Sequence, residues 1–267
     1  MHPRLLASNG RVAHVSLDGL VEADAFVSGN KKQIRAPITD LLRNAGGALD
    51  RQLLYGSGFL ELEHDIDAGF SFGLSESDGY VGYVRSCDLV APQQTTHKVS
   101  ALASHIYQYP DLKSPVLSCL YFASVLAVKE IKNGYAALIS GGFVPAQHVQ
   151  PLNLSEPDFV AVIERFLGVP YLWGGNSAWG VDCSGVVQLA LQASAKTCPR
   201  DADMQVGDLG ELLANDADLR RGDLIFWRGH IGVMQDAQRL IHANAFHMAV
   251  VSENLGQAVT RIEASGG

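Results

Sequence analysis

The chain contains no block rich in lysine or arginine and no long apolar run, and both absences exclude classes of function. Its 267 residues include 20 Lys+Arg against 28 Asp+Glu, which gives a formal charge of −8. A net acidic chain lacks the cationic surface that binds nucleic-acid phosphates, so we expect no nucleic-acid partner. The most apolar stretch, residues 117–128, is interrupted by polar side chains and is too short to cross a bilayer, so we expect no membrane span.

Cysteine is also scarce and widely spaced. The four cysteines form neither a CxxC metal motif nor a dense disulfide framework; they are Cys87, Cys119, Cys183 and Cys198. The first eight residues include one basic residue but no apolar core and no small-residue cleavage site, so they do not resemble a signal peptide. Together these features favour reduced thiols and a cytoplasmic location.

Turn signals divide the first half of the chain into three parts. Residues 1–33 mix short apolar pieces with Gly and Asp turns, and we interpret them as an irregular lead-in. Residues 34–93 and 94–152 share one order, in which a strand, a turn glycine followed by tyrosine, a second strand and a capped end succeed one another. Two such units of about 55–60 residues predict tandem small β-barrels. We expect Cys87 and Cys119 to pack inside them.

The pattern changes near residue 153, where a third domain, 153–267, is predicted to begin. Ser155 followed three residues later by Asp158 resembles a helix start, and apolar residues then recur at helical spacing until Gly168. A second helix is predicted from about Cys183 to Ala195. Four strand-like segments follow, at 223–227, 231–234, 240–243 and 248–251. Helices followed by strands predict an α+β domain with a mainly antiparallel sheet.

Of the four cysteines, Cys183 is the one whose neighbouring residues suit a catalytic role. A glycine-rich entry, with Gly174, Gly175 and Gly180, places it in the first turn of the second predicted helix. Backbone N–H groups there are unpaired and the helix dipole is positive, so we expect the cysteine pKa to fall below its free value of roughly 8.5. The same N–H groups can receive the oxyanion of a tetrahedral intermediate. Cys183 is therefore a candidate nucleophile.

His230 and His242 are the candidates for a base and its orienting partner. Each lies six residues from Asp236, so a hairpin that turns about Asp236 would place them directly opposite one another. His247 is five residues beyond His242, an odd offset that points it to the other face of a strand, and we leave it out of the site. Cys183, His230 and His242 could instead bind zinc, but a fourth ligand is missing.

Five short motifs, in this order, resemble the NlpC family of papain-like cysteine peptidases. They are Pro-Tyr-Leu-Trp-Gly-Gly (170–175), Asp-Cys-Ser-Gly (182–185), Arg-Gly-Asp-Leu-Ile-Phe-Trp (221–227), Gly-His-Ile-Gly-Val (229–233) and Leu-Ile-His-Ala (240–243). The two upstream barrels resemble the bacterial SH3-like domains that precede this catalytic domain in cell-wall peptidases. The expected fold is therefore two all-β SH3-like barrels followed by an α+β papain-like catalytic domain.

The resemblance implies a reaction and roles for the catalytic residues. The reaction is hydrolysis of the γ-D-glutamyl to diamino-acid amide bond in peptidoglycan stem peptides with a free N-terminal L-Ala, in murein peptide recycling. Cys183 is the implied nucleophile, His230 its base and His242 the residue that orients His230. Tyr171 would contact the cysteine and help to bind the reacting carbonyl; the less favoured alternative is a half-buried core tyrosine. We expect no cofactor and no metal.

The resemblance also implies substrate-binding residues, two beside the nucleophile, two in a loop that lines the site in relatives and one in the first barrel. They are Asp182, Ser184, Arg200, Asp201 and Tyr80. Asp182 and Ser184 equally suit helix capping, and Tyr80 a hairpin. Relatives commonly have a glutamate after Leu-Tyr-Gly to bind the substrate amine, whereas this chain has Ser57 there. Glu61 is a possible substitute, or Asp201 carries the charge alone.

Two other functions fit the same residues. A thiol-dependent acyltransferase or amidase would use the same acyl-enzyme, and a wall-binding module would keep the fold without the reaction. The intact set of Cys183, His230 and His242 favours an enzyme. The sequence leaves open the oligomeric state and the diamino acid accepted.

Overall fold

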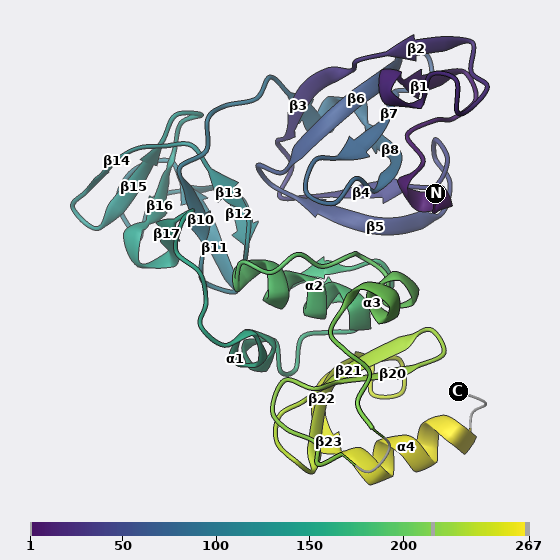
Figure 1. The fold of residues 1–267 in the computed structure, drawn as a ribbon. Helices are drawn as coiled ribbons and strands as arrows, with labels where there is room; N and C mark the ends of the chain where they lie inside the picture. Colours follow the sequence, from purple (N-terminus) through teal and green to yellow (C-terminus); the bar gives the residue numbers. More distant parts are fainter. Residues whose placement is uncertain (1, 215–216, 265–267) are drawn as a thin grey trace. The chain divides into compact units, whose positions relative to one another are not determined.

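The computed structural model describes residues 2–214 and 217–264, and the chain divides into two units, one up to Leu154 and one from Ser155 onward (Figure 1). The first unit is built from β-strands and short 3-10 helices, and the second contains the four α-helices of the described residues. In the described ranges, no helix combines the length and apolarity that a membrane span requires.

The first unit contains a seven-stranded antiparallel sheet. Its order is β5-β4-β8-β7-β6-β3-β9. The strands are β3 (Asn30–Ile34), β4 (Ile38–Leu42), β5 (Leu49–Leu54), β6 (Gly58–Asp65), β7 (Phe70–Ser75), β8 (Val81–Arg85) and β9 (Leu89–Val90). The turn around Asp78 and Gly79, a turn glycine followed by tyrosine as in the predicted order, joins β7 and β8, which pair with one another. Cys87, by contrast, is exposed in the 3-10 helix η3 (Ser86–Asp88), so its predicted place in a barrel core is wrong.

The lead-in is more ordered than the sequence indicated. It contains η1 (Pro3–Leu5), β1 (Val12–His14), η2 (Val15–Leu17) and β2 (Ala25–Val27), and β1 pairs with β2 in parallel. Ala13 and Leu17 are buried in one cluster with Leu62 and Phe72 of the seven-stranded sheet. The sheet itself begins at β3, four residues before the predicted start at residue 34. Burial of scattered small apolar residues, rather than a periodic pattern, orders this segment.

A second β region follows, with its own core. Its elements are β10 (His97–Val99), β11 (Ala103–Tyr107), β12 (Val116–Tyr121), β13 (Val125–Leu126), β14 (Val128–Lys132), β15 (Tyr135–Leu138), β16 (Phe143–Pro145), η4 (Ala146–His148) and β17 (Val149–Pro151). They form a three-stranded sheet, β13-β10-β17, and a five-stranded sheet, β12-β11-β16-β15-β14. Val99, Ile106 and Leu120 belong to the shared buried cluster, whereas Cys119 on β12 is only half-buried.

The two β regions are joined by a close backbone contact. The N–H of Val125 donates a hydrogen bond to the carbonyl of Tyr55 at 3.0 Å. At Gly56, whose φ is +81°, an added Cβ would lie 1.9 Å from the carbonyl oxygen of Val125. Only glycine allows this approach. The turn at 55–58, between β5 and β6, is thus also a contact point between the two β regions.

The second unit begins with helices. The helices are α1 (Phe159–Arg165), α2 (Cys183–Ala193) and α3 (Ala202–Asp208). A short hairpin of β18 (Asn176–Ser177) and β19 (Gly180–Val181) lies between α1 and α2 in the chain. Asp158 caps α1 by accepting a hydrogen bond from the N–H of Val160, so the helix begins at Phe159, four residues after the predicted signal at Ser155. The helix α2 is buried along nearly its whole length and packs against α1 and the sheet that follows.

That sheet has four antiparallel strands in the order β20-β21-β22-β23. They are β20 (Leu224–Trp227), β21 (His230–Met234), β22 (Arg239–Asn244) and β23 (Ala249–Asn254), close to the four predicted segments, and α4 (Leu255–Ala264) follows. Met234 and Leu240 share a buried cluster with Ala258 of α4. Because side chains alternate along a strand, His230 and His242 lie on that same face of the sheet.

Candidate active site

A tight loop places Cys183 in the first turn of α2. At Gly175 an added Cβ would lie 2.5 Å from the carbonyl oxygen of Gly180, so a side chain cannot fit. Asp182 caps the helix: its Oδ1 accepts a hydrogen bond from the N–H of Gly185 at 2.7 Å, and its Oδ2 accepts one from the N–H of Gly174 at 2.9 Å. The loop therefore holds the backbone of Cys183 in a single conformation.

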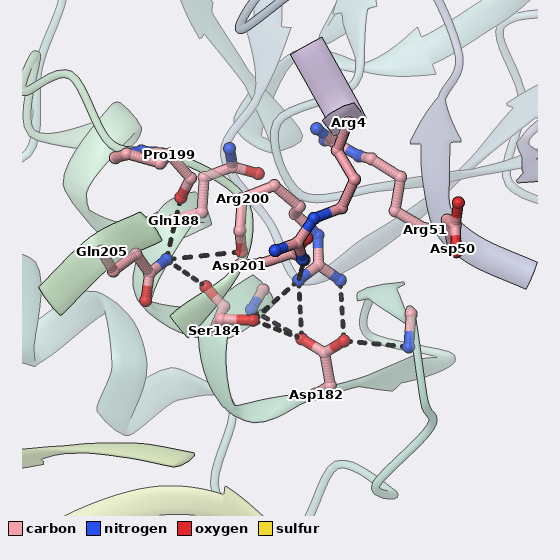
Figure 2. Close-up of polar contacts among 12 residues, drawn as sticks. Arg4, Asp50, Arg51, Asp182, Ser184, Gln188, Pro199, Arg200, Asp201 and Gln205 are labelled. Atoms are coloured by element: carbon pink, nitrogen blue, oxygen red, sulfur yellow. Dashed lines mark hydrogen bonds and ion pairs between the residues drawn. The ribbon is translucent and has the colours of Figure 1, made fainter. Parts of the chain in front are cut away.

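A buried arginine holds the carboxylate of Asp182 (Figure 2). Arg200 is 1% exposed, and its Nη1 and Nη2 atoms each donate to one oxygen of Asp182 at 2.9 Å. Nη1 also donates to the hydroxyl of Ser184 at 2.9 Å, and Nη2 to the carbonyl of Gly175 at 3.1 Å. Burial opposes the charge, but the Asp182 carboxylate outweighs it and raises the pKa of Arg200. Residues on both sides of Cys183 are thus tied to one guanidinium.

Gln205 extends this network and has no recognisable signal in the sequence. It lies on α3, and its Nε2 atom donates to the carbonyl oxygens of Ser184 at 3.0 Å and Pro199 at 2.9 Å (Figure 2). Asp182, Ser184 and Arg200 were expected to contact substrate. All three lie buried in this hydrogen-bonded network, where they support the nucleophile, and their contact with substrate stays a prediction.

The thiol of Cys183 is buried, and this changes its acidity. Burial raises its pKa to about 11, and the neighbouring Asp182 carboxylate acts in the same direction. The backbone N–H groups of Ile231 and Ser184 bond to the sulfur and lower the pKa, but by less. The expectation that the helix start lowers the pKa below its ordinary value is therefore wrong, because the cost of desolvating a thiolate is larger. The bond from Ile231 also places Sγ beside the start of β21.

Tyr171 lies near this thiol. It forms an isolated parallel bridge with Val181, two residues before Cys183. Burial raises the pKa of the Tyr171 phenol, and the nearby Cys183 and Asp182 raise it further. The phenol therefore keeps its proton at neutral pH and can donate a hydrogen bond toward the site.

The two histidines are in contact, as predicted, but in a different register. Nε2 of His230 lies 2.8 Å from Nδ1 of His242. Val233 pairs with Ile241 and Met234 with Leu240, and continuing this register places residue 232, not His230, opposite His242. The rings therefore meet diagonally across the strand pair.

The hairpin turn explains the shift. Asp236 begins the loop rather than centring it, because its Oδ1 accepts hydrogen bonds from the N–H groups of Gln238 and Arg239, both at 2.8 Å. The N–H of Gln235 then bonds to the carbonyl of Arg239. The loop is thus centred on Ala237, one residue later than predicted.

Behind His242 lies a carboxylate that the sequence did not indicate. Nε2 of His242 is 2.6 Å from Oε1 of Glu253, and Arg261 of α4 donates to both oxygens of Glu253 at 2.6 Å. Nδ2 of Asn244 also lies 2.8 Å from the same Nε2. Glu253 is two residues beyond Val251, the partner of His242 on β23, so only the strand register could have revealed it.

Burial controls the charge of both histidines. It lowers the pKa of His230 to about 4, with further lowering by His242 and Arg261 against an opposite effect of Glu253. It lowers the pKa of His242 as well, although Glu253 acts in the opposite direction. Burial works against ionisation of Glu253 too, but the hydrogen bonds from Arg261 and His242 outweigh it and lower its pKa to about 2. At neutral pH the pair is therefore uncharged beside an ionised Glu253.

Residues 168–261 match the family model described as NlpC/P60 family, and residues 41–89 match the one described as bacterial dipeptidyl-peptidase Sh3 domain. The second unit carries an NlpC/P60 domain. The resemblance inferred from the five motifs is confirmed, as is an SH3 domain upstream.

Two curated relatives of this chain share one name. A gamma-D-glutamyl-L-lysine dipeptidyl-peptidase of Bacillus subtilis is 31% identical over 62% of this chain and 60% of its own length. One of Bacillus cereus is 26% identical over 56% of this chain and 50% of its own length. This chain thus covers between half and two thirds of these two proteins. An NlpC/P60 family structure from Bacillus cereus has a TM-score of 0.72 at 18% identity, covering 85% of this chain and 94% of that one, which supports the fold.

The other predicted residues lie in different places. Asp201 is the residue that precedes α3, with Oδ1 3.9 Å from Nη1 of Arg200. Tyr80 belongs to the first unit, where the guanidinium of Arg51 lies 5.6 Å from its ring centroid. His247 lies in the turn after β22, not in a strand, and its backbone N–H and Nδ1 contact Asn244. It makes no hydrogen bond to His230 or His242.

Glu61 is engaged with side chains of its own sheet. Its carboxylate is buried, pairs with Lys32 at 3.4 Å, accepts a hydrogen bond from Ser71 at 2.7 Å and lies 3.2 Å from Nδ1 of His64. These contacts argue against Glu61 as the substitute for the glutamate missing at Ser57. Within residues 2–214 and 217–264, no three His, Cys, Asp or Glu side chains are arranged to hold a metal ion.

Proposed function

We propose that this chain is a cysteine peptidase that hydrolyses the γ-D-glutamyl to diamino-acid bond of peptidoglycan stem peptides. The observation that carries the proposal is the position of Cys183 at the start of α2, where its sulfur is bonded by the N–H of Ile231, the residue after His230. His230 in turn contacts His242. The names of the two curated relatives support the bond type.

The residues supply each step of an acyl-transfer reaction. His230 is neutral at pH 7 and takes the proton of Cys183 as the sulfur attacks the substrate carbonyl. The oxyanion accepts hydrogen bonds from backbone N–H groups of the first turn of α2 and from the neutral phenol of Tyr171. His230 then gives its proton to the leaving amine of the diamino acid. Water, activated by His230, hydrolyses the thioester and releases the glutamyl carboxylate.

Recognition of a free N-terminal L-Ala belongs to the same proposal. The usual glutamate is replaced by Ser57, and Glu61 is already paired with Lys32. Asp201 is therefore the carboxylate that we propose binds the substrate ammonium, because a charge-assisted hydrogen bond contributes roughly twice as much as a neutral one. We further assign substrate contacts to Asp182, Ser184, Arg200 and Tyr80 as the family motif implies.

The domain arrangement and cellular role are also proposals. We interpret 94–152 as a second SH3-like domain, supported by its apolar core. We interpret the second unit as a papain-like α+β domain, supported by its helices followed by an antiparallel sheet. We propose that the enzyme acts in the cytoplasm on recycled murein peptides. Cell fractionation and peptide accumulation in a deletion strain test the location and the role.

A panel of synthetic peptides tests the reaction. L-Ala-γ-D-Glu-L-Lys and the diaminopimelate equivalent should each release L-Ala-D-Glu, detected by mass spectrometry, and Cys183→Ala should abolish release. N-acetylated versions test the amine requirement, with Asp201→Asn expected to raise KM for the free peptides toward that of the acetylated ones. If wild-type protein leaves every peptide intact, the proposal is wrong.

A further inference from the structure

The carboxylate behind the histidine pair has a fixed charge and a fixed position. Glu253 is 12% exposed and receives two hydrogen bonds of 2.6 Å from Arg261, while Oε1 lies 2.6 Å from Nε2 of His242. Two guanidinium N–H groups favour the ionised form, so Glu253 can only accept hydrogen bonds. The group that meets it must be a donor.

This requirement fixes which ring nitrogens of His242 and His230 carry a proton. His242 is buried and neutral, so it carries one ring proton, which Glu253 draws to Nε2. Nδ1 of His242 is then an acceptor, and the proton in the 2.8 Å contact belongs to Nε2 of His230. The remaining nitrogen of His230, Nδ1, is left with a free lone pair. That is the form of His230 that can take a proton from Cys183.

Asn244 favours the opposite arrangement. Its Oδ1 accepts the backbone N–H of His247 at 2.8 Å, which turns Nδ2 toward Nε2 of His242 at 2.8 Å. An amide N–H donates, so Asn244 stabilises an unprotonated Nε2. His242 would then carry its proton on Nδ1 and donate to His230, whose own proton would occupy Nδ1. That form of His230 cannot act as a base.

We propose that Glu253, held by Arg261, is a positioning residue that overrides Asn244 and keeps His230 in its basic tautomer. The inference deepens the proposed function, because it assigns the orientation of the base in that same site. An ionised acceptor outweighs a neutral amide donor at the same distance. The charged or titratable groups around His242 are His230, Glu253, Arg261 and His247, and Glu253 is the anion among them.

Kinetics of matched variants test the proposal. Glu253→Gln should lower kcat about 10- to 100-fold with KM changed less than about twofold. Losses of this size follow when the hydrogen-bond partner that orients a functional histidine is removed, as at metal-binding histidines. Adding Asn244→Ala to Glu253→Gln should recover part of the lost kcat, because the competing donor is gone. Glu156→Gln is the control: Glu156 is also bound by both guanidinium nitrogens of an arginine, Arg165, and its variant should keep the wild-type kcat.

The acid limb of kcat/KM gives a readout that a purely structural role would not move. Glu253 raises the pKa of His230, so Glu253→Gln should shift that limb to lower pH. An unchanged kcat and an unchanged limb in the folded variant would overturn the proposal.

Nitrogen-15 NMR of the imidazoles tests the tautomers without depending on activity. In wild-type protein at pH 7 both His230 and His242 should carry the proton on Nε2, and Glu253→Gln should move part of the His242 population to Nδ1. A proton on Nδ1 of His242 in the wild type would overturn the inference even if peptides are cleaved. If no peptide is cleaved but both Nε2 protons are found, the proposed function fails and the inference on tautomers stands.

Discussion

Replacing Arg200 by methionine should destabilise the second unit strongly. The variant keeps most of the buried side-chain volume but removes the guanidinium that bonds both oxygens of Asp182, the hydroxyl of Ser184 and the carbonyl of Gly175. The Asp182 carboxylate then keeps the hydrogen bonds from the backbone N–H groups of Gly174 and Gly185 and from the hydroxyl of Ser184. Leaving a buried charge without its partner costs about 3–5 kcal/mol.

Tryptophan fluorescence can follow this loss in the full-length protein. The three tryptophans of the chain, Trp173, Trp179 and Trp227, all lie in the second unit, so their emission reports the unfolding of that unit alone. At a urea dependence of about 1.5 kcal/mol per M, a loss of 3–5 kcal/mol lowers the midpoint by about 2–3 M.

Two further variants show which interaction is lost. Arg165→Met removes a more exposed pair with Glu156 and should cost at most about 1 kcal/mol. Adding Asp182→Asn to Arg200→Met should recover part of the lost stability, because the unpaired charge is removed. If Arg200→Met shifts the midpoint no more than Arg165→Met does, the buried ion pair does not stabilise the unit and the reasoning is refuted.

Three other outcomes follow from the structure. Because burial lowers the pKa of His230 to about 4, kcat/KM should stay high as the pH falls below 6 and decline only near pH 4; a midpoint near the ordinary histidine value would contradict this. Burial raises the pKa of Cys183 to about 11, so iodoacetamide alkylation of Cys183 should be slow at neutral pH and accelerate only as the pH approaches 11; a rate that levels off near the ordinary cysteine value of about 8.5 would contradict this. Gly56→Ala should lower the thermal midpoint of the first unit, measured by β-sheet circular dichroism, because its Cβ would overlap the carbonyl of Val125. Gly79→Ala, also at positive φ but with open space around the added Cβ, is the control and should cost less.

Local patterns predicted the elements that carry the chemistry. The four strands of the second unit lie within two residues of the predicted segments at their starts, and α2 begins at Cys183 as the glycine-rich entry indicated. These signals are local: alternating apolar residues, turn formers and a capping aspartate each act over a few residues. The contact between His230 and His242 could be predicted for the same reason, since one hairpin joins them.

Features that depend on distant partners could not be predicted. The register of the hairpin that joins His230 and His242 depends on which backbone N–H groups bond to Asp236. These bonds place the centre of the turn one residue beyond the predicted position. Glu253 enters the site through strand pairing and through Arg261, eight residues further along. The acidity of Cys183 likewise follows from its burial, which no local pattern encodes.

The contact of Gly56 with Val125 limits how the first unit can be rearranged. SH3 domains are often treated as interchangeable modules, but here the bend of one β region receives a backbone hydrogen bond from the other and leaves no room for a side chain. A chimera that exchanges residues 34–93 alone would separate a glycine from the carbonyl it accommodates. The boundary for swapping or truncation therefore lies after residue 154, where the first unit ends, rather than between the two β regions.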